Sequence, residues 1–124
     1  MHGPEPRVLA PVGPSKIVAV GLNYRDHAAE MNKALPDEPL IFLKPSTAVI
    51  GTGASIVIPR DAGRVDYEAE VGVVIGRTAR HVPAARAHEY VLGLTCVNDV
   101  SDRDLQRRDV QYTRAKGFDT FAPV

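Results

Sequence analysis

Short apolar runs separated by glycine and proline recur along this chain and determine its expected structure. Runs of β-branched and aliphatic residues bounded by such breakers are typical of β-strands. Segments rich in helix-forming residues lie between some of them. The predicted strands span residues 16–21, 40–44, 47–50, 55–58, 66–76 and 90–97, and the predicted helices span residues 23–33, 83–90 and 101–114.

Details at the ends of these elements support the assignment. Asn23 is a plausible N-cap for the first helix. The turn 51–53, with two glycines, joins strands 47–50 and 55–58, and Pro59 ends the second of them. Short strands with few helices favour a β-rich α+β fold. The order of the strands does not follow from the pattern.

The length of 124 residues is that of one domain. Residues 1–15 contain four prolines and two glycines and are expected to form a loosely held lead-in. Residues 16–124 form the expected domain.

Composition narrows the class of protein. Lys plus Arg equals Asp plus Glu at 15 each, so no overall field favours nucleic acid or an anionic membrane. No apolar run reaches the ~18 residues of a membrane span, and residues 1–15 lack the apolar segment of a secretory signal. Cys96 is the one cysteine and cannot form an internal disulfide. We therefore expect a cytoplasmic protein without a nucleic-acid or membrane partner.

Two glutamates, Glu68 and Glu70, stand at the head of the strand 66–76. Residues i and i+2 of a strand face the same way, so their side chains are expected about 6–7 Å apart on one face. Such carboxylates raise each other's pKa unless a cation lies between them, and hard divalent cations prefer carboxylate oxygens. The alternative is that both face water on an edge strand.

A third acid, Asp99, follows the strand 90–97. Three carboxylates favour Mg²⁺, Mn²⁺ or Ca²⁺ over Zn²⁺, which prefers Cys and His ligands. The alternative is an ordinary turn or N-cap aspartate before the helix 101–114.

His27 and Glu30 stand three residues apart in the predicted helix 23–33 and share a face. A carboxylate beside an imidazole makes a general base for activating water, and the alternative is a solvated surface pair. Lys44 and Lys116 are candidates to neutralise a substrate carboxylate or an enolate, and the alternative is that both are solvated. The remaining histidines, His2, His81 and His88, are expected at the surface. Arg103, Arg107 and Arg108, on a polar helix, are expected to be surface or interface charges.

Taken together, five segments resemble the fumarylacetoacetate hydrolase family in its order, across roughly residues 16–123. The matching segments are residues 20–30, 42–45, 66–70, 98–104 without Asp102, and 116–121. Any one of these motifs is weak, and five in register are specific.

The resemblance implies a mixed β-sandwich roll, usually a homodimer, that binds Mg²⁺, Mn²⁺ or Ca²⁺. On the matching positions, it assigns the metal ligands to Glu68, Glu70 and Asp99, the water-activating dyad to His27 and Glu30 on a lid segment, and substrate contacts to Arg25, Lys44 and Lys116, with Lys116 also counted as catalytic. Family members hydrolyse, decarboxylate or isomerise 2-oxo acids, acylpyruvates and dicarboxylic dienoates in aromatic catabolism. A metal ion acting as a Lewis acid on a 2-oxo acid, with stabilisation of an enolate, suits all of these reactions.

One departure from the family affects these expectations. The family's catalytic domain continues well beyond the position of Val124, with further strands of the same sandwich and much of the dimer surface. We therefore expect a truncated domain with open sheet edges, completed by a second copy or by a complementing C-terminal chain. The alternative to an active enzyme is a catalytically inactive fragment or metal-binding remnant.

Overall fold

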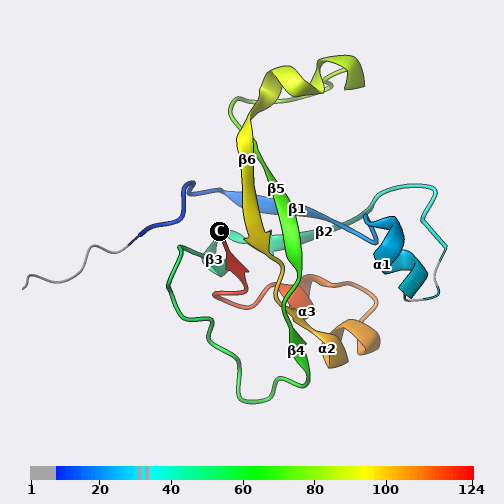
Figure 1. Ribbon diagram of the computed structural model, residues 1–124, viewed down its shortest axis with the longest axis vertical. Helices are drawn as coiled ribbons and strands as arrows, with labels where there is room; N and C mark the ends of the chain where they lie inside the picture. The colour runs from blue at the N-terminus through cyan, green and yellow to red at the C-terminus, as the bar shows by residue number, and fades with distance from the viewer. Residues whose placement is uncertain (1–7, 31, 33) are drawn as a thin grey trace, which may run out of the picture.

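A computed structural model describes residues 8–30, 32 and 34–124, with the side chains of His27 and Glu30 outside this description. It contains two antiparallel hairpins and several short strand pairs (Figure 1). Within the described part of the chain, helices are all too short or too polar to cross a bilayer.

The first hairpin pairs β1 (Lys16–Gly21) with β2 (Leu40–Pro45). Val18 lies opposite Leu43, and Ala19 lies opposite Phe42. The alternation along β2 buries Phe42 and Lys44 and leaves Leu43 exposed. The short helix α1 (Arg25–Glu30) lies in the connection between the two strands.

The second hairpin pairs β5 (Ala69–Ile75) with β6 (Val91–Asn98), in a register that sets Glu70 opposite Val97. An irregularity between Val74 and Ile75 shifts the register near the far end. The hairpin rises away from the rest of the molecule, and the 3₁₀ helix η2 (Ala84–Tyr90) caps its tip (Figure 1).

Shorter elements gather at the foot of this hairpin. Strand β4 (Val65–Asp66) pairs antiparallel with β7 (Ser101–Asp102), and β3 (Val49–Ile50) pairs parallel with β8 (Ala122–Pro123). The 3₁₀ turn η1 (Ser46–Ala48) precedes β3, and the helices α2 (Arg103–Arg108) and α3 (Thr113–Lys116) follow β7.

The core lies where β2, β7, β8 and α3 meet, and it is small. Its buried apolar residues are Ala28, Phe42, Ala48, Val100, Ala115, Phe121 and Ala122. Phe121 packs edge-on against Phe118 with 5.2 Å between ring centroids. The same region buries the polar residues Lys44, Ser101, Asp102 and Lys116, so the centre of this fold is a polar network beside a few apolar side chains.

Several predicted elements differ from the structure. Residues 55–58 form no strand: the backbone N–H of Val57 donates to Oγ1 of Thr120 at 2.8 Å, and among the described residues this segment pairs with no strand. The predicted hairpin 47–58 is therefore wrong, and β3 pairs with the distant β8.

Other differences concern helices. The predicted helix 101–114 is two helices, because Asp109 adopts an extended backbone at φ −89°, ψ 145° and ends α2. The helix predicted over 23–33 is described only over α1, and Met31 and Lys33 lie outside the described residues. Most remaining predicted strands are confirmed within a residue or two. The predicted strand 66–76 is wrong, because it is divided into β4 and β5 with Tyr67 and Glu68 in neither, so Glu68 and Glu70 do not share one strand.

Candidate functional site

Backbone pairing at the foot of the second hairpin brings two of the predicted acids together. The carbonyl oxygen of Glu68 accepts a hydrogen bond from the N–H of Asp99 at 2.9 Å. The N–H of Glu68 donates to Oδ1 of Asn98 at 3.1 Å. These contacts continue the pairing of β5 with β6 past the last strand residue and fix Glu68 beside Asp99.

The Lys116 ammonium group lies between these two carboxylates. Its Nζ is 2.7 Å from Oε2 of Glu68, 2.8 Å from Oδ2 of Asp99 and 2.6 Å from Oγ of Ser101. It also lies 5.2 Å from the centre of the Phe42 ring. An ammonium has three protons to donate, so these three oxygens satisfy Lys116 in a buried position.

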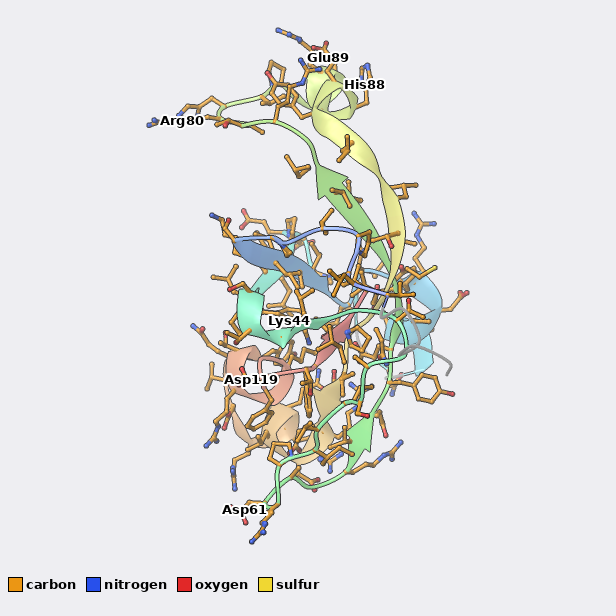
Figure 2. All side chains as sticks on the ribbon, turned by 90° about the vertical axis from the view of Figure 1, so that its left-hand side faces the viewer. Lys44, Asp61, Arg80, His88, Glu89 and Asp119 are labelled. Atoms are coloured by element: carbon orange, nitrogen blue, oxygen red, sulfur yellow. The ribbon has the colours of Figure 1, made fainter. Side chains whose placement is uncertain are left out.

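Lys44 reaches Asp99 from the other side. Its Nζ is 2.5 Å from Oδ1 of Asp99 and 3.3 Å from the carbonyl oxygen of Val100. Figure 2 places Lys44 in the body of the molecule, far from Arg80 and His88 at the hairpin tip. Burial lowers the pKa of Lys44, and the negative charge of Asp99 opposes that shift. The alternative that Lys44 and Lys116 are solvated is wrong, since both are buried.

Arg103 completes the set of cations. Its guanidinium contacts Oε1 of Glu68 at 2.6 Å, Oδ2 of Asp66 at 2.9 Å and Oε1 of Gln106 at 2.8 Å. The prediction that Arg103 is a surface or interface charge is therefore wrong: α2 starts directly after β7, and its first residue pairs with acids of the same chain. Arg107 and Arg108 are exposed, as expected.

Glu70 lies near both of the other predicted ligands. Burial is the largest cause that raises its pKa, and the negative charges of Glu68 and Asp99 raise it further. A hydrogen bond from the side chain of Tyr24 lowers it in part. The three acids predicted from sequence therefore act on one another in the fold.

A groove of about 1290 Å³ opens over these residues between the two hairpins. The charged residues along it include Lys44, Glu68, Glu70, Asp99 and Lys116. Tyr24 lines it from the start of α1. Acidic and basic groups together with apolar side chains along one groove are an arrangement suited to a small polar ligand.

A divalent metal is compatible with the chemistry of these residues. Among residues 8–30, 32 and 34–124, side chains are not gathered into a ready-made cluster of three metal ligands. The two carboxylates of Glu68 and Asp99 nevertheless converge on one cation, the ammonium of Lys116. Carboxylate oxygens facing a shared positive charge are the donors that Mg²⁺, Mn²⁺ and Ca²⁺ prefer.

The alternative prediction that Asp99 caps the following helix is wrong, because the N-cap of α2 is Asp102. Oδ1 of Asp102 accepts from the N–H groups of Asp104 at 2.9 Å and Leu105 at 3.0 Å. Its Oδ2 accepts from the N–H of Gly63 at 3.1 Å. An aspartate directly before a run of helix formers was the available signal.

Sequence reasoning also missed two contributors. Ser101 accepts a hydrogen bond from Lys116, and nothing in the sequence around this serine indicated that contact. Tyr24 lies inside the motif 20–30, and nothing in its spacing pointed to Glu70.

The remaining predicted site residues lie on α1. Arg25 is exposed at the first position of the helix. His27 and Glu30 belong to the same helix, and their side chains lie outside the described part of the chain. Their predicted pairing stays a prediction.

Comparison with known proteins gives one consistent family. The family described as fumarylacetoacetate (FAA) hydrolase C-terminal matches residues 16–124. A fumarylacetoacetate hydrolase domain-containing protein 2 homolog of Dictyostelium discoideum is 45% identical over 120 residues, which are 95% of this chain and 39% of that protein.

Solved structures of the same family are also similar to this chain. The 5-carboxymethyl-2-hydroxymuconate delta-isomerase from Mycobacterium smegmatis is similar with a TM-score of 0.84 and 56% identity, over 94% of this chain and 47% of that one. The 2-hydroxyhepta-2,4-diene-1,7-dioate isomerase from Mycobacterium marinum is similar with a TM-score of 0.83 and 48% identity, over 94% and 42%.

These matches also confirm the expected fold class. The chain spans about half the length of the relatives that it matches, or less. Its small, β-rich structure is accordingly a part of their fold. This chain belongs to the fumarylacetoacetate hydrolase family.

Proposed function

We propose that this chain carries the acidic, metal-holding part of a divalent-metal-dependent enzyme acting on 2-oxo acids or acylpyruvates. The observation that supports this most is the convergence of Glu68 and Asp99 on one cation, with Glu70 beside them, in an open groove. Two structural relatives are named as isomerases of unsaturated acids with two or three carboxylates, which favours isomerisation in aromatic catabolism over hydrolysis or decarboxylation. The expected location is the cytoplasm, where a free cysteine stays reduced.

In this proposal Glu68, Glu70 and Asp99 would hold Mg²⁺, Mn²⁺ or Ca²⁺. Such an ion supplies Lewis acidity toward the oxygen of a 2-oxo group. Arg103 donates to Glu68 and fixes the direction in which that carboxylate points, and Tyr24, which helps lower the pKa of Glu70, lines the same groove.

The basic residues provide binding and charge stabilisation. Lys116 and Lys44 lie along the groove and would neutralise a substrate carboxylate. Arg25, the first residue of α1, would be a further substrate contact. His27 and Glu30 would move a proton between two carbons of the substrate. Such an isomerisation conserves all atoms and requires no co-reactant.

The test is an assay of the chain with Mg²⁺ or Mn²⁺ on an unsaturated 2-oxo dicarboxylate, on an acylpyruvate and on oxaloacetate. We expect turnover that falls by about 10²-fold or more in Glu68→Gln and His27→Ala. Asp61→Asn is the matched control and should keep full activity, because Asp61 does not line the groove and lies at the end of the molecule away from the hairpin tip (Figure 2).

The second candidate function is a metal-binding remnant without turnover. This candidate is supported by the length of the chain, which covers about half of its relatives. Metal uptake that depends on Glu68, with no turnover on any of the three substrates, would assign this function instead.

The outward faces of the two hairpins carry exposed apolar side chains. On β5–β6, Val71, Val73 and Leu94 are 63%, 54% and 70% exposed. On β1–β2, Val18 and Ile41 are 56% and 61% exposed. Whole apolar faces of two-stranded hairpins are stable only when another layer covers them.

We propose that the remaining part of the family domain covers these faces, as a C-terminal half in the same or in a separate polypeptide. The relatives are about twice as long as the matched region, which supplies enough protein for a second layer. Mixing this chain with a C-terminal half from a relative should give a one-to-one complex in light scattering. A homodimer of this chain alone, unchanged by the added half, would assign a second copy as the partner.

A further inference from the structure

The acidic site is electrically balanced by the chain's own cations. The three acids are Glu68, Glu70 and Asp99, and the three bases that contact or surround them are Lys44, Lys116 and Arg103. Three negative and three positive formal charges cancel. Asp66 shares Arg103 and has a second cation, Arg64, at 2.9 Å, so this pair does not change the balance.

Lys116 is the member of this set that a metal ion must displace. It fills the space between Oε2 of Glu68 and Oδ2 of Asp99 and is 3% exposed. A divalent cation that uses the same two oxygens removes both carboxylate partners from a buried ammonium. An uncompensated buried charge is strongly unfavourable.

A divalent cation alone would therefore leave the site with two excess positive charges and one ammonium without a carboxylate partner. A dianion brings two negative charges and supplies new acceptors for the ammonium of Lys116. The balance of the site is restored only when both ligands are present, so each should raise the affinity for the other.

We infer that a divalent cation and a dianionic 2-oxo acid bind this chain cooperatively, with Lys116 exchanging Glu68 and Asp99 for the anion. This inference rests on the proposed function and names the coupling between its two ligands. It assigns Lys116 a second task besides substrate contact: it stabilises the acids before the metal arrives.

The experiment measures Mn²⁺ binding by the relaxation rate of water protons, with oxalate as the dianion. Enhancement of this rate reports Mn²⁺ held on a macromolecule, whereas a small Mn²⁺–oxalate complex in solution gives little. We expect oxalate to tighten Mn²⁺ binding by about tenfold or more. Lys116→Gln should bind Mn²⁺ about tenfold more tightly than the original chain without oxalate, and should lose most of the oxalate effect.

Three variants make the result specific. Lys116→Arg keeps the charge and should keep the oxalate effect. Arg80→Gln removes a positive charge at the far tip of the hairpin (Figure 2) and should change nothing. Lys44→Gln removes the other cation that contacts Asp99 and should also tighten Mn²⁺ binding. This variant tests the inference if Lys116→Gln does not fold.

The outcomes separate this inference from the proposed function. Mn²⁺ binding that is equal with and without oxalate, and equal in the original chain and in Lys116→Gln, overturns the cooperative coupling and leaves the metal-dependent function standing. Absence of Mn²⁺ binding in all folded variants, with or without oxalate, overturns both.

Discussion

The side-chain oxygen of Asn98 accepts a hydrogen bond from the backbone N–H of Glu68 at 3.1 Å. This contact, together with the bond from the N–H of Asp99 to the carbonyl of Glu68, joins two segments that are thirty residues apart. Asn98 therefore positions two acids of the site without being one of them.

Replacing Asn98 by alanine should destabilise the fold by about 1–2 kcal/mol, because the Glu68 N–H loses its partner in a half-buried place. Urea unfolding measures this change, and amide hydrogen exchange at Glu68 should become faster. Thr52→Ala, at an exposed turn position, is the control and should stay within about 0.5 kcal/mol. Unchanged exchange at Glu68 would contradict this account of Asn98.

Asp102 is expected to contribute more to stability than an ordinary helix cap. It is completely buried and accepts three backbone hydrogen bonds, from Gly63, Asp104 and Leu105. Asp102→Ala should lower the free energy of unfolding by about 2–3 kcal/mol. Asp102→Asn keeps one acceptor oxygen and should lose less; equal losses in urea titrations would show that the acceptor contacts are not the cause.

Gly117 follows the site lysine in a position without room for a side chain. A Cβ there would lie 2.3 Å from the carbonyl oxygen of Thr113 and 3.3 Å from Cδ of Pro45. Because the nearer atom belongs to the backbone, Gly117→Ala should destabilise the chain by about 2 kcal/mol. Gly93→Ala, where the new methyl group meets no atom within 4 Å, is the matched control in thermal or urea unfolding.

The two short helices α2 and α3 are tied by an ion pair that depends on pH. Arg114 donates to both carboxylate oxygens of Asp109, at 2.7 and 2.5 Å, and thereby lowers the pKa of Asp109 below its ordinary value of 3.8. A lowered native pKa contributes stability above the ordinary value, and this contribution is lost as pH falls through the lowered native pKa.

Asp109→Asn should therefore lower the urea midpoint at pH 7, and the difference from the original chain should shrink in acid below the ordinary value of 3.8. Urea titrations over a pH series check this. Asp61→Asn, at the exposed end of the molecule, is the control. A difference that grows in acid would have the wrong sign.

Local patterns predicted the strands of this fold better than its pairings. The runs 16–21 and 40–44 are short, mostly apolar and bounded by breakers, and they are β1 and β2 with little change. The predicted hairpin 47–58 failed because β3 pairs with β8, more than seventy residues away, and such long-range pairing leaves no mark in a local pattern.

The site shows the same division. The spacing of Glu68 and Glu70 predicted two neighbouring acids, whereas the contact that brings Glu68 beside Asp99 comes from long-range backbone pairing. Arg103 was missed because a charged residue on a polar helix has the same local pattern whether it faces solvent or acids. Only the tertiary position of α2 decides this.

The exposed thiol of Cys96 offers a test of what covers the second hairpin. Cys96 lies opposite Val71 on the outward face of β5–β6, near Leu94. In the chain alone, a thiol reagent should modify it rapidly. Once a C-terminal half of the family domain has bound, the modification should slow by about tenfold or more, because the second layer covers that face. Leu94→Lys should prevent this protection, whereas Glu89→Lys at the hairpin tip (Figure 2) should not. A formed complex in which Cys96 remains fully reactive would show that the added half binds elsewhere and that this apolar face has another partner.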